Sequence, residues 1–435
     1  MISMAEGSPT GRNVAGSAVI VSCDGHFGPA MESLREYCPA RYREQFDDYA
    51  SSVKAQRRRE AAAYLAASLG KRGETDSGSA STVRRRLRSD LELIRRNRRS
   101  TGDQDMAVRL SDMDADGVAA EVVFHGAKNG EPIPFVPGGV DFFYDTASAD
   151  RHLVAIGQHI YNQALADACS TAPARHIGVA HAPLWNVSSA IKELEWARSV
   201  GLRAVNFSAP RPGVSDFDDE EWEPFWSAIE DLDMTLATHA GASDPSASYG
   251  GVVGAAVRQL EIDFFNLRGL PRMIFGGVFE RHPGLRIVFT EIRAELWARY
   301  ARELDRVHAD TPQTHARAPK RPSEYMSSNV FVGASYLLDN IAAAEVVRDD
   351  YANNVMWGRD YPHPEGTWVF REGDEEPATR RALRRAMAGI PHPEAKLMVG
   401  ATAARVYGVD LNVLGTIAAA INAPPLEELV GLPAT

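Results

Sequence analysis

Acidic and imidazole side chains recur in this sequence directly after short runs of strand-forming residues. The run from Val355 to Gly358 is followed by Asp360, at the start of a proline-punctuated loop. A parallel strand that ends in this way leaves the carboxylate at the carboxyl edge of its sheet, where α/β barrels carry their chemistry. We therefore expect other reactive side chains to converge on Asp360.

The first strand-forming run, Ala18 to Cys23, ends in a second candidate pair, Asp24 and His26. Side chains at positions i and i+2 of a strand point to the same face, so both residues can reach one barrel mouth. The alternative is a turn-forming Asp-Gly with an incidental histidine, and the dipeptide alone favours that alternative.

Four more candidates follow other strand-forming runs, and a fifth lies in the loop beyond Asp360. They are His125, His181, His239, Glu291 and His363. A single histidine at a strand end is usually structural, but several at one edge indicate a site. Two imidazoles and two carboxylates suffice to bind one divalent cation, and the carboxylates neutralise its charge. We predict one metal ion, zinc or manganese with iron also possible, on Asp24, His26, His239 and Asp360.

Helix-like stretches separate the strand-forming runs over most of the chain, which predicts βα units and a parallel sheet. We count eight runs, at residues 18–23, 120–124, 176–180, 203–207, 235–238, 286–290, 330–332 and 355–358. Eight units predict an α/β fold, a (β/α)8 TIM barrel with a helical insertion after the first strand. The barrel should span residues 18–410, between a flexible tail at 1–17 and a C-terminal tail at 411–435.

The insertion, residues 41–100, differs in composition from the rest of the chain. It holds 16 Lys and Arg against 8 Asp and Glu, a local charge of +8, and this leaves −19 for the remainder of a chain whose net charge is −11. Its two halves have helix-forming composition and flank a Gly/Ser-rich linker. We expect a solvated helical arm that packs on the barrel or on a second subunit. A lid or basic collar that attracts an anionic substrate is the alternative.

Composition limits the classes of function. The 435 residues, 44% hydrophobic, can form a large core, and the negative charge argues against general nucleic-acid affinity. Arginine runs at 57–59, 84–86 and 95–99 lack the interleaved aromatic residues of nucleic-acid sites. Only three cysteines occur, without C-x-x-C spacing, which fits a reducing cytoplasm. No apolar run is long enough for a membrane helix, and we expect neither a signal peptide nor a membrane partner.

Seven short motifs together resemble the amidohydrolase superfamily, in the branch called amidohydrolase family 2, from about residue 18 to 407. They are Asp-Gly-His-Phe at 24–27, Asp-Met-Asp-Ala-Asp-Gly-Val at 112–118, His-Ile-Gly-Val-Ala-His-Ala-Pro at 176–183, Thr-His-Ala-Gly at 238–241, Gly-Gly-Val-Phe-Glu-Arg-His-Pro at 276–283, Trp-Gly-Arg-Asp-Tyr-Pro-His-Pro at 357–364 and Ala-Ala-Arg-Val-Tyr-Gly at 403–408. Each motif alone is weak, whereas their order and spacing are specific for the family, though not for one reaction.

The resemblance implies metal-dependent chemistry and assigns several residues. His239 would be the ligand after strand five and Asp360 the carboxylate after strand eight. The family usually opens with His-x-His, whereas this chain has Asp24 first, an acidic variation similar to that of several aromatic-acid decarboxylases in the group. Many members place a catalytic histidine after strand six, where this chain has Glu291, and that difference leaves the reaction type open.

Two reactions fit these residues. In hydrolysis the metal lowers the pKa of a bound water and Asp360 removes its proton. In decarboxylation Asp360 or Glu291 protonates a ring carbon before carbon dioxide departs. We favour cleavage of a carbon–carbon bond, by nonoxidative decarboxylation or hydrolysis, in a small cyclic or aromatic carboxylated or carbonyl-bearing substrate. The alternatives are an amide or lactone hydrolase and a non-catalytic binding protein on a barrel scaffold.

Three residues are candidates for substrate contacts: His125 as a polar contact, Arg293 as a carboxylate clamp and Trp368 as an aromatic wall. For Arg293, a surface residue in the first turn of a helix is an equal alternative. His181 and His363 are expected behind the metal ligands. A Glu291 with a raised pKa would support the role of proton donor, whereas a Glu291 paired with Arg293 or another cation would indicate a structural or substrate-orienting role. We also expect a homodimer.

Overall fold

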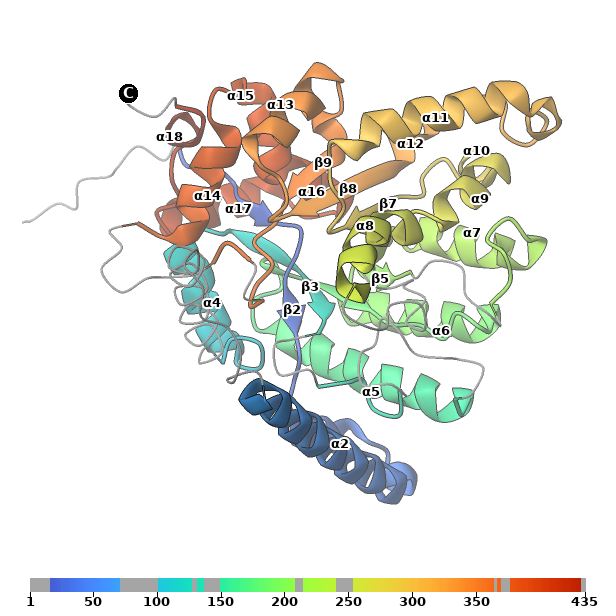
Figure 1. The fold of residues 1–435 in the computed structure, drawn as a ribbon, viewed down its shortest axis with the longest axis vertical. Helices are drawn as coiled ribbons and strands as arrows, with labels where there is room; N and C mark the ends of the chain where they lie inside the picture. Colours follow the sequence, from blue (N-terminus) through green and yellow to red (C-terminus); the bar gives the residue numbers. More distant parts are fainter. Residues whose placement is uncertain are drawn as a thin grey trace, which may run out of the picture.

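The computed structural model describes residues 16–70, 101–126, 131–136, 149–207, 214–239, 253–363, 366–368 and 376–431. One parallel sheet forms its centre, in the order β1-β3-β4-β5-β6-β7-β8-β9, with β2 also paired to β3 (Figure 1). The strands are β1 (Val21–Ser22), β2 (His26–Phe27), β3 (Ala120–His125), β4 (His176–Ala180), β5 (Ala204–Asn206), β6 (Thr235–His239), β7 (Ile287–Thr290), β8 (Val330–Ser335) and β9 (Val355–Trp357).

The predicted first strand, residues 18–23, is shortened to β1, and β2 follows it as a second short strand; both pair with β3 in parallel. Asp24 and Gly25 occupy the break between them. The two ends of the sheet meet where the backbone N–H of Cys23 donates to the carbonyl of Trp357 at 3.0 Å and Gly25 forms a parallel bridge with Tyr361. The sheet is thus a nearly closed eight-unit barrel, and the predicted TIM-barrel fold is confirmed.

Alternation along the strands separates two apolar cores. One set of buried side chains fills the barrel together with C-terminal helices, and the other packs between the strands and the outer helices. Val122 and Phe124 of β3 belong to the inner core, whereas Val123 belongs to the outer one. A strand buried on both faces needs apolar residues at successive positions, which explains the continuous apolar runs of the sequence.

Helices cover the outside of the barrel, and Asp105 and Asp150 cap the starts of two of them by accepting backbone N–H groups. Among the described residues, no helix combines the length and apolar character needed to cross a bilayer. The helices are α1 (Met31–Leu34), α2 (Arg43–Gly70), α4 (Met106–Asp116), α5 (Arg151–Ser170), α6 (Val187–Ser199), α7 (Glu223–Asp231), α8 (Gly254–Asn266), α9 (Gly269–Phe275), α10 (Val278–Arg281), α11 (Leu296–Asp310), α12 (Pro322–Asn329), α13 (Asn340–Arg348), α14 (Ala378–Met387), α15 (His392–Lys396), α16 (Thr402–Val406), α17 (Leu411–Ala420) and α18 (Leu426–Val430).

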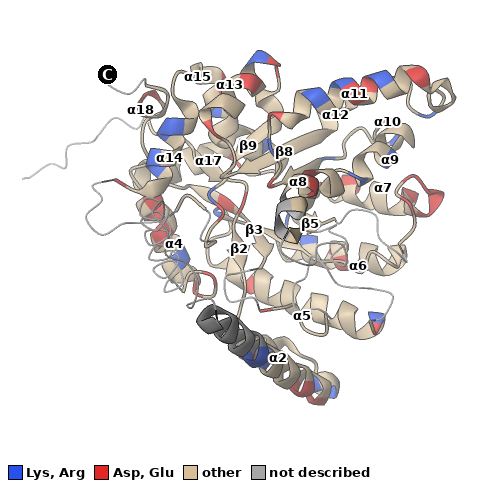
Figure 2. Ribbon diagram, in the orientation of Figure 1, with Lys and Arg blue, Asp and Glu red and all other residues tan. Residues whose placement is uncertain are grey.

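The described part of the insertion is the long helix α2, which lies outside the barrel (Figures 1 and 2). Its first half packs on residues 131–136, the segment beyond β3. The Tyr49 hydroxyl donates to the carbonyls of Ile133 and Val136, and the rings of Phe46 and Tyr49 contact Phe135. Residues 71–100 of the predicted insertion lie outside the described residues, so the full extent of the arm remains a proposal.

The predicted C-terminal tail, residues 411–435, contains two helices, α17 and α18. Leu414 and Ala418, four residues apart on one face of α17, are fully buried in the inner core. The segment is short and rich in alanine, so its sequence shows little contrast between a buried and an exposed helix face. Its role in the fold is visible only from its burial against the barrel. Pro425, before α18, forms an antiparallel bridge with Ser17, so this segment lies beside the first described residues.

We predict that Gly400→Ala destabilises the barrel. A Cβ at Gly400 would lie 2.0 Å from the carbonyl oxygen of Val19, just before β1, and the backbone there must move. Such overpacking costs about 1–3 kcal/mol. Gly415→Ala in α17 is the matched control, because nothing lies within 4 Å of its Cβ and alanine favours a helix by roughly 0.5–1 kcal/mol. Denaturant unfolding measures both changes, and equal stability of the two variants would contradict the packing.

Candidate metal centre

The four predicted ligands converge at the carboxyl edge of the barrel. The Nε2 atom of His26 lies 3.4 Å from Oδ1 of Asp24 and 3.2 Å from Oδ1 of Asp360. Oδ1 of Asp24 is also 3.3 Å from Nε2 of His239. All four side chains are buried, and the ring of Phe124 packs against both imidazoles as an apolar wall. The structure thus brings together residues from the first, fifth and eighth barrel units.

The donor atoms of this cluster fit a metal ion. Nε2 of His26 and both carboxylate oxygens of Asp360 make no hydrogen bond to the described residues, although they are fully buried. Buried polar atoms without hydrogen-bond partners are costly. Because several such atoms meet at one point, a metal ion bound by all of them is the simplest explanation. Three overlapping groups drawn from the four ligands, Glu291 and His363 have donor atoms within 4.8 Å of one another. Two imidazole nitrogens and two carboxylates suit zinc, manganese or ferrous iron.

The charges within the cluster reinforce one another. Burial alone would lower the pKa of His26, but the carboxylates of Asp24 and Asp360, at 3.4 and 3.2 Å from its Nε2 atom, raise it well above its usual range. Burial would raise the pKa of Asp24, yet His239 and His26 hold it well below its usual range. The carboxylates therefore draw positive charge to this point, which is the electrostatic property of a cation site.

Glu291 adjoins the four ligands from the end of β7. Its Oε2 atom lies 3.6 Å from Nδ1 of His239, and burial raises the pKa of Glu291 to about 8. Arg293 does not pair with it, because the Arg293 guanidinium donates to Asp263 of α8 at 2.7 Å. Glu291 therefore shows features of both arrangements considered: its pKa is raised, and the imidazole of His239 faces its carboxyl group.

Ser335 is a site residue that the sequence analysis missed. Its hydroxyl donates to Oδ2 of Asp24 at 2.6 Å and so fixes the carboxylate whose other oxygen faces the histidines. The predicted strand ended at Val332, whereas β8 continues to Ser335. Applying the strand-end rule to the full strand would have found it.

The backbone is strained where three strands deliver their functional side chains. Glu291, Ser335 and Asp360 have φ angles of 58°, 53° and 52°, in the left-handed region that non-glycine residues rarely adopt. Strain of this kind costs about 1–3 kcal/mol per residue and persists where the surroundings enforce it, commonly at functional sites. The left-handed turns direct all three side chains toward Asp24 and His239.

His125 and His181 lie beside the cluster. The ring of His125 packs against Tyr161 of α5 at 4.7 Å between centroids, and His181 is 5.9 Å from it. Burial, with the nearby His181 and His26, lowers the pKa of His125 well below its usual range. The backbone carbonyl of His125 lies 3.0 Å from Nδ1 of His26, so β3 orients that ligand. The imidazole of His125 as a substrate contact stays a prediction.

Trp368 and His363 belong to the loop beyond β9. Nδ1 of His363 lies 2.9 Å from Oδ1 of Asp360, and its ring stacks on His26 at 4.0 Å. The Trp368 indole donates to the carbonyl of His363 and packs against Tyr361. Trp368 is only 4% exposed, so in this structure it supports the loop. Its role as an aromatic wall for substrate stays a prediction.

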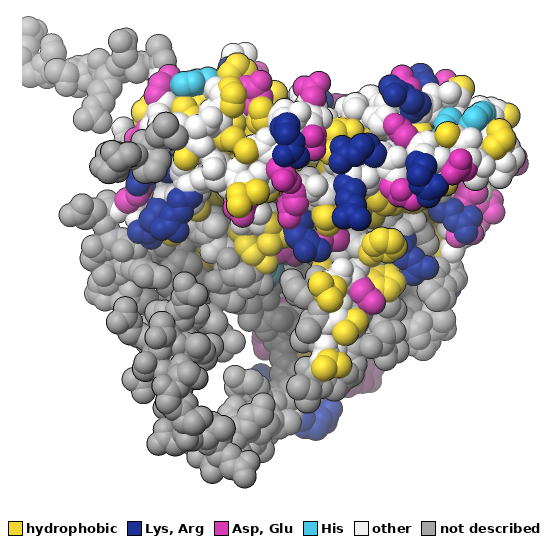
Figure 3. All heavy atoms as spheres, turned by 45° about the horizontal axis from the view of Figure 1, so that its top comes forward, with side chains coloured by type: hydrophobic (Ala, Val, Ile, Leu, Met, Phe, Trp, Pro, Cys, Tyr) yellow, Lys and Arg dark blue, Asp and Glu magenta, His cyan; other side chains and the backbone are white. Residues whose placement is uncertain are grey.

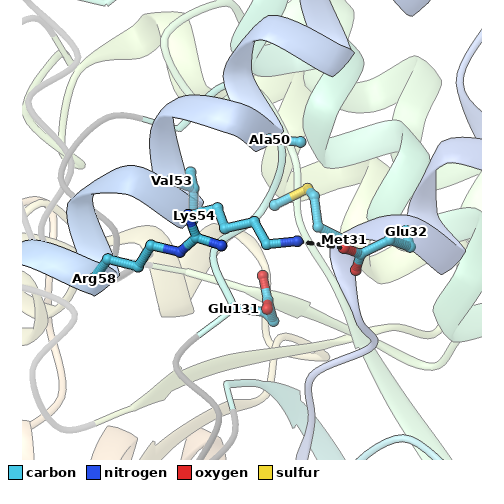
Figure 4. A pocket seen from close by; sticks show the side chains of 7 residues that line it. All are labelled: Met31, Glu32, Ala50, Val53, Lys54, Arg58 and Glu131. Carbon is cyan, nitrogen blue, oxygen red and sulfur yellow. Dashed lines mark ion pairs between the residues drawn. The ribbon is translucent and has the colours of Figure 1, made fainter. Parts of the chain in front are cut away.

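A cavity of about 330 Å³ lies between α1, α2 and the segment beyond β3 (Figure 4). Lys54 and Arg58 of α2 line it together with Glu32 and Glu131, and Lys54 is 3.9 Å from Glu32. Because two cations face two carboxylates, the lining has no net charge. This cavity is therefore not a basic site for an anionic substrate.

Comparison with known families identifies the chain. The model of the amidohydrolase family matches residues 101–409, more than half of the chain. The chain belongs to the amidohydrolase family. The predicted metal ligands lie both inside and outside the matched segment, since Asp24 and His26 precede it.

Several similar proteins are named as decarboxylases. The gamma-resorcylate decarboxylase of Rhodococcus jostii (strain RHA1) is 27% identical over 224 residues, which cover 46% of this chain and 64% of that protein. The 5-carboxyvanillate decarboxylase of Sphingomonas paucimobilis has 18% identity and a TM-score of 0.56, over 91% of this chain and 100% of that one. The enzyme of that name from Novosphingobium aromaticivorans, solved with manganese and a nitrobenzoic acid, has 18% identity and a TM-score of 0.59, over 93% and 100%. At these identities the structures show the shared fold.

We predict that His239→Ala abolishes tight binding of one divalent metal ion without unfolding the barrel. The substitution removes a predicted metal ligand, whereas the apolar cores that hold the barrel together are unchanged. Metal content after dialysis and far-UV circular dichroism measure the two effects. His315→Ala, at an exposed histidine in the turn that follows α11, should keep the metal. A metal-replete His239→Ala protein would refute the ligand assignment.

Proposed function

We propose that this amidohydrolase-family chain is a metal-dependent nonoxidative decarboxylase of a small aromatic acid. The observation that carries the proposal is the cluster of Asp24, His26, His239 and Asp360, which has a further carboxyl group, Glu291, 3.6 Å from one ligand. Hydrolysis needs one carboxyl group to move the protons of water, and Asp360 can serve for that. Decarboxylation needs an acid that can protonate carbon, and Glu291 supplies a second carboxyl group for that role.

The similar proteins support the substrate class. One is named for gamma-resorcylate, and two structures are named for 5-carboxyvanillate. The chain spans about two thirds of the curated relative, so its own substrate and activity are proposals. A benzoate with an oxygen substituent beside the carboxylate is the substrate that we propose, and manganese is the metal.

A bound divalent cation would supply a Lewis acid that holds the substrate carboxylate and the neighbouring oxygen. Asp24, His26, His239 and Asp360 would hold this cation, and Ser335 fixes the orientation of Asp24. The ring of Phe124 packs against His26 and His239 and gives the inner side of the site an apolar wall. These residues orient the ring so that the carbon bearing the carboxylate faces a proton donor.

Glu291 or Asp360 then holds and delivers the proton. The acid transfers a proton from its carboxyl oxygen to the ring carbon, and the bond from that carbon to the carboxylate breaks. The electron pair of the broken bond restores the aromatic ring, and carbon dioxide departs. The carboxylate left on the enzyme recovers its proton from solvent. General acid catalysis of this kind contributes about 10²–10⁴-fold to a rate.

Two alternatives remain as outcomes of the tests below. An amide or lactone hydrolase would use the same cluster, with Asp360 as the base. A binding protein on a barrel scaffold would be expected to lack one or more of the four ligand residues, and all four are in place.

We also propose a cytoplasmic location, since all three cysteines are free and buried.

We propose a homodimer formed through α8. Val253, Val257, Leu260 and Phe264 are 69%, 38%, 75% and 77% exposed, and their 4-3-4 spacing gives one apolar stripe (Figure 3). This is the spacing with which two helices pack against each other, and a stripe that pairs with its own copy forms a two-fold interface.

We predict that Leu260→Asp shifts the mass measured by light scattering from dimer to monomer, because a carboxylate in the middle of the stripe cannot be buried without a partner. A wild-type protein that is monomeric at high concentration would contradict the proposal.

We predict carbon dioxide release from hydroxybenzoates when the manganese-loaded protein is incubated with panels of hydroxybenzoates, cyclic diketones, amides and lactones. Carbon dioxide and incorporation of labelled oxygen from water are followed separately, since only hydrolysis incorporates water oxygen. Turnover of amides or lactones alone would refute decarboxylation and leave the hydrolase. Turnover of no compound, with metal bound, would favour the binding protein.

Two variants serve as controls for this assay. His239→Ala should lose metal and activity together. Glu291→Gln should keep the metal and release carbon dioxide about 10²–10⁴-fold more slowly if Glu291 is the proton donor. An active Glu291→Gln protein would assign the proton transfer to Asp360.

A further inference from the structure

Two fully buried arginines connect the loops that carry the predicted metal ligands. Arg109 of α4 and Arg359, which precedes Asp360, are both 0% exposed, as are their partners Glu121 and Asp116. A buried guanidinium needs several acceptors to replace its lost water. The residues that supply these acceptors show what the arginines hold in place.

Arg109 joins β2 to β3. One guanidinium nitrogen donates to the carboxylate of Glu121, another to the backbone carbonyl of His26, and Nε donates to the carbonyl of Gly102 at 3.0 Å. The carbonyl of His26 belongs to a metal ligand, so Arg109 fixes the backbone from which that imidazole projects.

Arg359 joins the last strand to the same carboxylate. Its Nε donates to the second oxygen of Glu121 at 3.0 Å, and Nη1 donates to Asp116 at 2.6 Å. Its backbone N–H donates to the hydroxyl of Ser22 at 2.9 Å, and that hydroxyl donates to the carbonyl of Asp24 at 2.6 Å. Glu121 therefore binds both arginines, with one carboxylate oxygen for each.

Tyr361 fills the space between the two arginines. Its ring centroid lies 4.9 Å from the guanidinium carbon of Arg109 and 4.4 Å from that of Arg359, and its hydroxyl donates to Asp112 at 2.6 Å. Its carbonyl accepts from the backbone N–H of His26 at 2.6 Å. The packing leaves little room, because a Cβ at Gly102 would lie 1.7 Å from the Tyr361 hydroxyl.

We propose that Arg109, Glu121 and Arg359 are positioning residues for the metal centre: they hold the 24–26 loop and the 359–361 loop at the separation that a shared metal ion requires. The inference rests on the metal-dependent function proposed above. It also explains the Asp-Met-Asp-Ala-Asp-Gly-Val motif at 112–118, whose first and third aspartates bind Tyr361 and Arg359 and do not reach the metal cluster. The network touches the ligands only through their backbone and neighbours.

The test measures Mn²⁺ affinity of the metal-free, folded protein by competition with a chelating dye. Glu121→Gln should weaken Mn²⁺ binding by about 10- to 100-fold, the loss typical of residues that orient metal ligands. Glu230→Gln is the matched control, because it makes the same change to a carboxylate that lies 3.1 Å from His282, away from the cluster. This variant should leave Mn²⁺ affinity unchanged. Loss of thermal stability alone, with wild-type Mn²⁺ affinity in the Glu121→Gln protein, would overturn the inference.

Arg109→Lys gives a second reading if Glu121→Gln does not fold. Lysine keeps the charge beside Glu121 but cannot donate to Gly102, Glu121 and His26 together, so Mn²⁺ affinity should fall and hydrogen exchange of residues 24–26 and 359–361 should accelerate. Unchanged affinity and exchange would refute the positioning role. A wild-type protein that binds no Mn²⁺ would instead refute the proposed function, and accelerated exchange in the variant would still establish the network.

Discussion

Asp24 is the carboxylate on which the site depends. It is fully buried, its Oδ1 faces two imidazoles at 3.3–3.4 Å and its Oδ2 accepts from Ser335. A buried carboxylate is stable only where cations or donors surround it. Residues from β2, β6 and β8 therefore meet at this one side chain. The fold places the ends of these strands together, and the charge of Asp24 explains why polar side chains occupy an otherwise apolar interior.

Much of this arrangement could be predicted from the sequence, because strand ends carry the information. Apolar runs of the length of a buried strand indicated the barrel, and Asp24, His26, His239 and Asp360 each follow such a run. The geometry of a parallel barrel then brings them to one edge without knowledge of any side-chain contact. Glu291 was found by the same rule.

Other parts could not be predicted, for identifiable reasons. Arg293 follows the same strand as Glu291, yet its partner Asp263 lies on α8, and no local pattern records that pairing. The burial of Trp368 depends on the packing of its loop against Tyr361, which no local pattern records, and its contact with substrate stays a prediction. The buried arginines carry no signal at all, since a charged residue in a sequence is normally exposed. α17 was missed because alanine-rich segments show weak amphipathic contrast.

The break in the first strand has a consequence for folding. Asp24 and His26 flank the seam at which the first strand meets the last, and Ser22 contacts Arg359, 337 positions further along the chain. A chain that lacks its final βα unit can form most of the sheet but cannot close this seam. The predicted ligands come from both sides of this seam, so a bound cation would link the two ends of the sheet and stabilise the closed barrel over any form in which the seam is open.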